Sequence, residues 1–301
     1  MTPAIETVGL TKTYGKNRGI VDLSLVVQPG EVFGFLGPNG AGKTTTIRAL
    51  AGLQRPAGGV AKVLGYDCWA QAVEVHRHIG YLPGELRLFE AMTGTQHLSW
   101  FIRARGIDEP AGLADLLRRF EVVLDRPVGQ LSTGNRQKLG IVLALMHEPQ
   151  VLILDEPTSG LDPLMQEVFH RLVREAVEQG RTVFLSSHEL DEVQRLADRV
   201  AIIREGRLVV TDTVEHLRSG APRIIEVTLK RRVASRALAG LDGVRVIRSE
   251  GRRCTVELTG PIGPFLRVVA ELDPVDLTAR RADLDELFLG YYQEGQPARV
   301  G

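Results

Sequence analysis

Residues 37–44 have the residue types and the spacing of a phosphate-binding loop. They read GPNGAGKT and match the pattern G-x-x-x-x-G-K-S/T. Glycines let backbone N–H groups approach a polyphosphate, the lysine brings a cation to the terminal phosphates, and the hydroxyl after it can ligate Mg²⁺. The segment predicts binding of a nucleoside triphosphate and Mg²⁺, with Thr44 on the metal, by Gly37, Pro38, Asn39, Gly40, Ala41, Gly42, Lys43, Thr44 and Thr45.

Two adjacent carboxylates, Asp155 and Glu156, follow the short apolar run 151–154. An acidic residue at the end of a buried strand beside the phosphate loop can complete the ligand shell of Mg²⁺. The carboxylate next to it can accept a proton from an attacking water. Taken alone, an Asp-Glu pair after a strand can also simply begin a polar loop, so both interpretations remain open at this point.

A second candidate anion site lies at residues 131–140, which read LSTGNRQKLG. Ser, Thr and Gly precede a helical pattern there, and the start of a helix offers free backbone N–H groups to an anion. One chain thus carries two phosphate-binding helix starts, which raises the question of what the second one binds.

The elements around these residues alternate between short apolar runs and helical patterns. The runs at 32–36, 151–154 and 182–185 are each followed by polar residues and then by a helical pattern. This alternation predicts an α/β fold with a mostly parallel sheet covered by helices. Residues 94–147 read as successive helices and predict a separate helical lobe.

The character of the chain changes at the Ser-Gly-Ala-Pro turn of residues 219–222, so we expect one domain at 1–220 and a small one at 221–301. The small domain reads as strand, helix, strand, strand, helix and strand. These elements are expected at 223–229, 233–240, 244–248, 254–258, 264–272 and 275–282. Their order fits a split βαβ sandwich.

Composition limits the classes of function. The 37 basic and 37 acidic residues balance, so charge points to no nucleic-acid partner. Cys68 and Cys254 match no metal-site spacing and predict reduced thiols in a cytoplasmic protein. The N-terminus lacks signal-peptide character, and no apolar run approaches the roughly 20 residues of a membrane-spanning helix. The sequence therefore predicts a soluble or peripheral protein.

From residue 4 to about 218 the chain resembles the nucleotide-binding subunit of an ATP-binding cassette (ABC) transporter, because every motif of that family occurs in order. Residues 37–44 match the Walker A loop, 151–156 the Walker B strand, 159–162 the D-loop, and 131–140 the family signature. The resemblance implies a P-loop NTPase of the ABC cassette fold. Its parts are a mostly parallel sheet core, an antiparallel β part and a helical lobe, here with a small C-terminal α+β domain.

The resemblance also implies roles for single residues. Glu156 stands at the position of the catalytic carboxylate and Asp155 at that of a Mg²⁺ ligand. Of the seven histidines only His188, after the strand TVFLSS, fits a motif, that of the switch histidine. Tyr14 stands where the family stacks an aromatic ring on adenine. The remaining nucleotide contacts implied by the signature and the D-loop are Ser132, Gly134 and Asp162.

Two departures from the family pattern bear on these roles. The signature has Thr133 and Asn135 where Gly and Gln are common. The loop that usually carries a Gln after the strand IGYLP reads Gly84-Glu85 here. Either Glu85 takes over the contact to metal and water, or this loop does less in this chain.

The family packs two cassettes head to tail, so that the signature helix of one caps the γ-phosphate held by the loop of the other. The implied partners are therefore a second copy of the chain and an integral-membrane permease on a separate chain, with no nucleic acid. The implied cofactors are ATP and Mg²⁺, and the implied location is the cytoplasmic face of the membrane. The second helix start, at 131–140, would serve the nucleotide of the partner copy.

The predicted function is ATP hydrolysis coupled to transport. Residues 79–98 and the segment 283–292, DLDELFLGYY, resemble cassettes of bacterial exporters of drugs, antibiotics or lipids. A soluble ABC ATPase that acts on nucleic acid or ribosomes is one alternative. Another is that the C-terminal domain makes the chain a ligand sensor that regulates transport.

Overall fold

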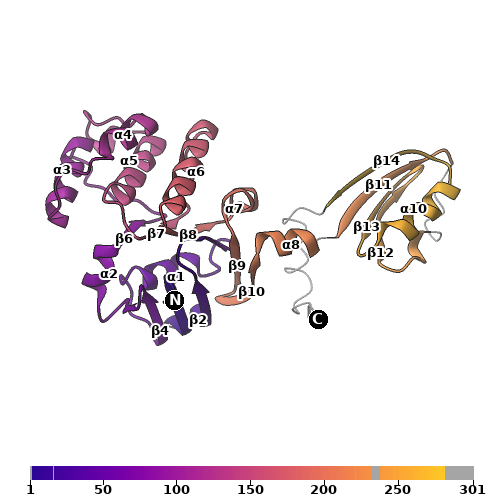
Figure 1. Cartoon of the computed structure of the whole chain (residues 1–301), viewed down its shortest axis with the longest axis horizontal. Coiled ribbons are helices and arrows are strands. Elements are labelled where there is room, and N and C mark those ends of the chain that lie inside the picture. Colours follow the sequence, from indigo (N-terminus) through magenta and orange to yellow (C-terminus); the bar gives the residue numbers. More distant parts are fainter. Residues whose placement is uncertain (1, 16, 221, 232–237, 282–301) are drawn as a thin grey trace. The chain divides into compact units, whose positions relative to one another are not determined.

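The structure is a computed structural model, and it describes residues 2–15, 17–220, 222–231 and 238–281. By its contacts the chain divides into two compact units, Met1–Thr213 and Val214–Gly301. Figure 1 shows the elements of both along the chain. None of the helices in the described ranges has the length and apolar character needed to cross a membrane.

A six-stranded sheet forms the centre of the first unit. Its order is β10-β9-β3-β8-β7-β6, and all neighbouring pairs are parallel except β9 and β10. The strands are β3 (Val32–Leu36), β6 (Ile79–Leu82), β7 (Val151–Asp155), β8 (Thr182–Ser187), β9 (Arg199–Arg204) and β10 (Arg207–Thr213). β3, β7 and β8 are buried along their whole length, which explains their continuous apolar runs. The predicted α/β fold is confirmed.

A second, antiparallel sheet with the order β2-β1-β4-β5 packs onto the same core. It consists of β1 (Ile5–Tyr14), β2 (Asn17–Val27), β4 (Gly58–Val63) and β5 (Tyr66–Asp67). Side chains of both sheets meet in one apolar cluster, in which the rings of Phe33 and Phe184 stack with their centroids 5.8 Å apart. This core holds the ends of the central strands in place.

Helices connect the strands of the first unit. They are α1 (Lys43–Leu50), α2 (Ala72–His78), α3 (Gly94–Arg105), α4 (Leu113–Phe120), the 3₁₀ turn η1 (Val128–Gln130), α5 (Thr133–Leu145), α6 (Pro163–Glu178) and α7 (Leu190–Leu196). Residues 94–147 hold α3, α4, η1 and α5, with α3, α4 and α5 grouped at one side of the sheet in Figure 1. Each motif found in the sequence therefore lies where a strand ends or a helix begins.

Parallel strands bring these ends to one edge of the sheet. In the strand register Leu36 pairs with Ser187 and Asp155 pairs with Ser186, so the segments after β3, β7 and β8 emerge side by side. Those segments carry the phosphate loop, the two carboxylates and His188. The topology of the sheet is what makes distant sequence motifs into neighbours.

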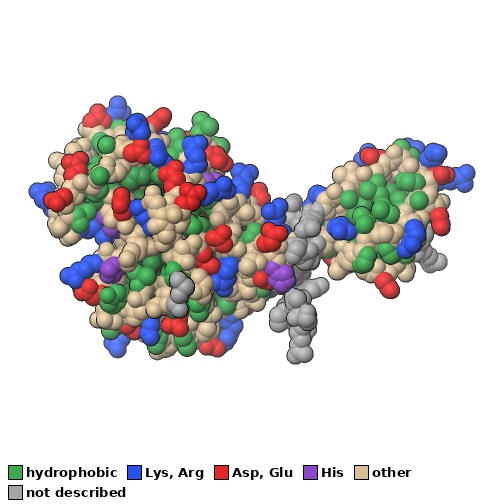
Figure 2. Space-filling view, in the orientation of Figure 1, with side chains coloured by type: hydrophobic (Ala, Val, Ile, Leu, Met, Phe, Trp, Pro, Cys, Tyr) green, Lys and Arg blue, Asp and Glu red, His purple; other side chains and the backbone are tan. Residues whose placement is uncertain are grey.

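The second unit contains one antiparallel sheet with the order β12-β13-β11-β14. Its elements are α8 (Val214–Gly220), β11 (Arg223–Leu229), β12 (Val244–Glu250), β13 (Arg253–Leu258), α10 (Ile262–Glu271) and β14 (Pro274–Arg281). Phe265 and Val269 of α10 pack on alternate side chains of β11 and β13. The helix expected at 233–240 falls mostly outside the described residues. Figure 2 shows apolar side chains gathered on one face of this unit.

His147 makes the stability of the first unit depend on pH. Its Nε2 donates to the carbonyl oxygen of Ile79 at 3.0 Å, and burial lowers the pKa of the ring to about 4. The unfolded chain, with a histidine pKa near 6.5, binds the proton first, so folding free energy is lost as pH falls from about 6.5 to about 4. This loss is at most about 3 kcal/mol, less solvent screening.

We therefore expect His147→Gln, which keeps a donor for Ile79 but does not titrate, to flatten the pH dependence of Tm in this window. Thermal unfolding of the variant and the wild type at pH 7.5, 6 and 5 measures this pH dependence. His216→Gln, a change at an exposed histidine of the second unit, is the control. Equal slopes for His147→Gln and the wild type would remove His147 as the cause.

Candidate active site

The loop between β3 and α1 is shaped by glycines in backbone conformations that side chains rarely adopt. Gly40 and Gly42 have positive φ values of 81° and 113°. A side chain at Gly42 would also place its Cβ 2.8 Å from the carbonyl oxygen of Gly19. The loop therefore wraps tightly in front of α1, whose first residue is Lys43, and leaves backbone N–H groups at the start of the helix for an anion.

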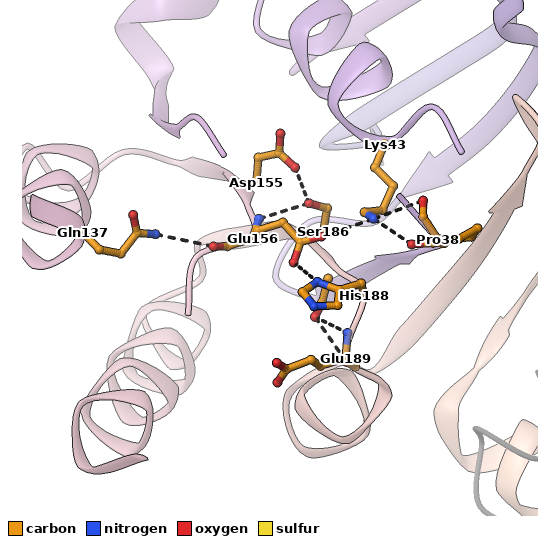
Figure 3. A network of polar contacts seen from close by, with 10 residues as sticks. Pro38, Lys43, Gln137, Asp155, Glu156, Ser186, His188 and Glu189 are labelled. Atoms are coloured by element: carbon orange, nitrogen blue, oxygen red, sulfur yellow. Dashed lines mark hydrogen bonds and ion pairs between the residues drawn. The ribbon is translucent and has the colours of Figure 1, made fainter. Parts of the chain in front are cut away.

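The side chain of Lys43, the first residue of α1, reaches back to the start of this loop and is almost fully buried. Nζ donates to the carbonyl oxygen of Gly37 at 2.6 Å and to that of Pro38 at 3.5 Å. It also forms an ion pair with Glu156 Oε1 at 3.2 Å (Figure 3). A single ammonium group thus joins the loop to the residue that follows β7.

Glu156 stands between two partners. Its Oε2 lies 2.6 Å from His188 Nδ1, while Oε1 faces Lys43 (Figure 3). The backbone of Glu156 is left-handed, with φ 50°, and its N–H donates to Ser186 Oγ at 3.1 Å and to the Ser186 carbonyl oxygen at 3.2 Å. The Glu156 side chain is about one-fifth exposed and that of His188 about half, so a water molecule can reach this pair.

Asp155 ends β7 in a fully buried position. Its Oδ1 accepts a hydrogen bond of 2.5 Å from Ser186 Oγ, and its Oδ2 is buried without a partner. A buried carboxylate oxygen with no hydrogen bond is costly unless a cation or another donor satisfies it. Asp155 therefore fits the position of a metal ligand.

A cavity of 460 Å³ is bordered by the phosphate loop, Lys43 and the two carboxylates, whereas His188 is not among the described residues that line it. The predicted residues that line it are Tyr14, Pro38, Asn39, Gly40, Gly42, Lys43, Thr44, Thr45, Glu85, Asp155 and Glu156. Two predicted residues of the same loop, Gly37 and Ala41, are not among the described residues that line the cavity. The carbonyl oxygen of Gly37 accepts a hydrogen bond from Lys43, and Ala41 is buried. Arg48 of α1 also lines the cavity, although the sequence motifs did not predict it as a site residue. Its position one helical turn after Thr44 is the feature of the sequence that indicates this location.

Tyr14 lies at the rim of the cavity, with nearly half of its surface exposed. Its hydroxyl donates to Gln54 Oε1 at 2.8 Å, and Lys12 Nζ lies 5.8 Å from the centre of its ring. A side chain at Gly19 would clash with the ring, because its Cβ would come within 2.8 Å of Cε2. The ring thus packs closely against Gly19 at the edge of the site, with its hydroxyl bonded to Gln54.

Glu85 lines the cavity, but its carboxylate does not point to Asp155. The side chain of Glu85 is 76% exposed, and its Oε2 lies 3.4 Å from Arg87 Nη2. Gly84 is the residue that approaches Asp155, since a Cβ there would lie 3.1 Å from Oδ2. The loop after β6 therefore presents backbone rather than a carboxylate to the buried acid.

The second helix start lies away from the cavity. Ser132 caps α5 by accepting from the N–H of Asn135 at 3.2 Å, and Asp162 caps α6 by accepting from Met165 at 3.0 Å. A Cβ on Gly134 would lie 2.8 Å from the carbonyl oxygen of Gly160, so these two starts pack closely. Ser132, Gly134 and Asp162 are not among the described residues that line the cavity of their own chain.

Comparison with known proteins matches this arrangement to one family. A model of the family described as ABC transporter matches residues 20–159. The daunorubicin/doxorubicin resistance ATP-binding protein DrrA of Streptomyces peucetius is 37% identical over 313 residues, which cover 99% of this chain and 94% of DrrA. The bacitracin transport ATP-binding protein BcrA of Bacillus licheniformis is 37% identical over 76% of each chain.

Solved structures agree with these relatives. The structure of an ATP-binding subunit of an ABC transporter superposes with a TM-score of 0.67 at 32% identity, over 72% of this chain and 92% of that one. A dimeric bacterial ABC transporter cassette, at 22% identity, has the same fold with a TM-score of 0.64 over 70% of this chain and 98% of its own. The chain therefore belongs to the ABC transporter family, as an ATP-binding subunit that couples ATP hydrolysis to transport.

Proposed function

We propose that Glu156, His188 and Lys43 form the hydrolytic centre for ATP. The observation that carries this proposal is that Glu156, which lines the cavity, contacts both of the others, with its carboxylate oxygens 3.2 Å from Lys43 Nζ and 2.6 Å from His188 Nδ1. Glu156 accepts the proton of the attacking water, and His188 orients the carboxylate and the water. When ATP binds, Lys43 exchanges the loop carbonyls for oxygens of the terminal phosphates.

Thr44 and Asp155 are the residues that would hold Mg²⁺. They fit the ion because the Thr44 hydroxyl follows the phosphate loop and the buried Oδ2 of Asp155 has no other partner. Bound there, Mg²⁺ would offset the negative charge of the phosphates. Glu85 can add a ligand only by giving up its ion pair with Arg87.

Tyr14 is proposed as the platform for adenine. Its ring lies at the rim of the cavity, and Gly19 and Gln54 limit its movement. An aromatic ring held in this way can stack on a nucleobase without losing further side-chain entropy.

Two copies of the chain are proposed to share each ATP. Ser132 and Gly134 at the start of α5, and Asp162 at the start of α6, do not line the cavity that their own chain forms from described residues. A two-fold arrangement would bring them to the partner's nucleotide, and the related cassette of known structure is dimeric. The second helix start then serves the nucleotide of the other copy.

The transported substrate is proposed to be a drug-like or antibiotic compound. Two of the relatives are named for resistance to daunorubicin and doxorubicin and for bacitracin transport, and the first matches almost the whole chain. The permease would be a separate integral-membrane chain, with this subunit peripheral on the cytoplasmic face.

Purification of the tagged chain from membranes of its own organism tests the proposal as a whole. We expect a protein with several apolar segments of about 20 residues to be retained with the tagged chain. The same extract without the tagged chain is the control. Retention of ribosomes or DNA in place of a membrane protein would support a soluble ABC ATPase instead.

ATP binding is expected to survive removal of the second unit. All the residues that line the cavity belong to Met1–Thr213, and the two units have separate cores. A chain that ends at Thr213 should bind a fluorescent ATP analogue within about threefold of the full-length Kd, because each compact unit keeps its own contacts. A folded, soluble fragment that fails to bind would show that the second unit contributes to the site.

A further inference from the structure

Gln137 is a buried polar residue on α5 for which the motifs assign no role. Only 7% of its surface is exposed, and it is the first buried residue of a helix in which positions 139–145 are all buried. Burying a polar side chain lowers the stability of the fold unless its hydrogen-bonding groups find partners. The contacts of its carboxamide therefore indicate its function.

The carboxamide of Gln137 donates to the backbone of the catalytic segment. Nε2 lies 2.8 Å from the carbonyl oxygen of Pro157 and 3.4 Å from that of Glu156. In Figure 3 Gln137 approaches Glu156 from the side opposite to Lys43 and His188. Both hydrogen bonds go to backbone carbonyls and not to the carboxylate of Glu156, and Gln137 is not among the described residues that line the cavity.

The backbone that Gln137 holds is strained. Glu156 is a non-glycine residue with φ 50°, a conformation that persists only when its surroundings fix it. Ser186 fixes the amino side of the residue by accepting from its N–H, and Gln137 fixes the carboxyl side by donating to the two carbonyls. The left-handed turn directs the carboxylate away from the line of β7 and toward Lys43 and His188.

We propose that Gln137 is a positioning residue for hydrolysis, which holds Glu156 in its left-handed turn by hydrogen bonds to the Glu156 and Pro157 carbonyls. This inference rests on the proposed role of Glu156 as general base. Gln137 belongs to α5, and the start of this helix is proposed to bind the nucleotide of the partner copy. Gln137 therefore also connects the general base of its own chain's ATP site to the signature segment that serves the partner's ATP site.

Steady-state ATP hydrolysis by the full-length chain tests the proposal, with ATP binding measured separately. Gln137→Met keeps the length and volume of the side chain but removes the donor. We expect kcat to fall on the order of 10-fold to 100-fold, since a small displacement of a catalytic group has such effects. The Kd for ATP should stay within about twofold, because binding uses the phosphate loop.

Gln194→Met is the matched control. Its Nε2 is likewise buried, but without a hydrogen-bond partner, and it lies on α7. Removing this amide should leave kcat unchanged. If Gln137→Met hydrolyses ATP as fast as Gln194→Met, or loses ATP binding in parallel with hydrolysis, the positioning role is wrong.

Gln137→Glu gives a readout that a purely structural role would not change. A buried carboxyl group beside two carbonyl oxygens keeps its proton to higher pH and can then donate as Gln does. We expect this variant to approach wild-type kcat at the acidic end of the profile and to lose it as pH rises. A profile parallel to that of the wild type contradicts the proposal, as does uniform inactivity with normal folding and ATP binding.

A double variant separates this inference from the proposed function. If Gln137 acts only through Glu156, Gln137→Met combined with Glu156→Gln is no slower than Glu156→Gln alone. A further loss in the double variant overturns the inference and leaves the role of Glu156 intact. Wild-type kcat in Glu156→Gln alone would instead overturn the proposed function of Glu156 and, with it, the basis of the inference.

Discussion

Glu156→Gln is expected to lower kcat for ATP hydrolysis by about two to four orders of magnitude, the usual effect of losing a general base. Glutamine has the same shape as glutamate, so it can occupy the same place between Lys43 and His188. Its amide cannot accept the proton of the attacking water. ATP binding should be nearly unchanged, because the phosphate loop and Lys43 remain.

The same variant should accumulate as an ATP-bound dimer, since hydrolysis no longer removes the γ-phosphate that the two copies are proposed to share. Size-exclusion chromatography with ATP and Mg²⁺ detects this, and a phosphate-release assay measures kcat. Glu189→Gln is the matched control, because it removes an exposed carboxylate in the turn that carries His188. Turnover at the wild-type rate in Glu156→Gln would falsify the assignment of Glu156 as the base.

Cysteines introduced by Asn39→Cys and Ser132→Cys are expected to form a disulfide only between two copies of the chain. Both residues are exposed in their own chain, one on the phosphate loop and one before α5. A disulfide requires Cα atoms within about 7 Å, so oxidation measures their proximity. A mixture of Asn39→Cys and Ser132→Cys proteins should give a covalent heterodimer on a non-reducing gel, with most of the protein cross-linked when ATP is present.

The native cysteines are expected to react slowly in this experiment. Cys68 and Cys254 are buried, and burial raises the pKa of the Cys68 thiol to about 12 and that of Cys254 in the same direction. Each of the two variants, Asn39→Cys and Ser132→Cys, oxidised alone gives the background of symmetric pairing. A chain with both new cysteines that closes an internal disulfide, without any heterodimer in the mixture, would show that α5 serves its own nucleotide.

Ser132→Cys also removes a helix cap, because Ser132 Oγ accepts from the N–H of Asn135. The expected cost is about 1 kcal/mol of stability. Thermal unfolding of this variant therefore accompanies the cross-linking experiment, and a lowered Tm with a normal cross-link remains consistent with the shared site.

The parts of the site that are local in the chain could be predicted from the sequence. The glycine spacing of residues 37–44 requires a turn that only glycine allows, and Gly40 and Gly42 do adopt positive φ values. The fully apolar runs predicted buried strands, and β3, β7 and β8 lie at those positions. Short-range sterics and burial act within a few residues, so a pattern of a few residues reveals them.

The division of the chain is less local. The Ser-Gly-Ala-Pro turn placed the expected boundary after residue 220, whereas the contacts divide the chain after Thr213 and assign α8 to the second unit. Glycine and proline mark where the backbone turns. Which core a helix belongs to depends on the side chains it meets, and these lie elsewhere in the sequence.

Only the tertiary structure decided the different surroundings of the two adjacent acidic residues. Asp155 and Glu156 are adjacent in the chain, yet one is buried with an unpartnered oxygen and the other faces Lys43 and His188. The left-handed turn at Glu156 separates them, and its anchors are Ser186 and Gln137. These partners lie 30 and about 20 residues away in the sequence. No local pattern contains such contacts, because they exist only once the parallel strands and α5 have packed together.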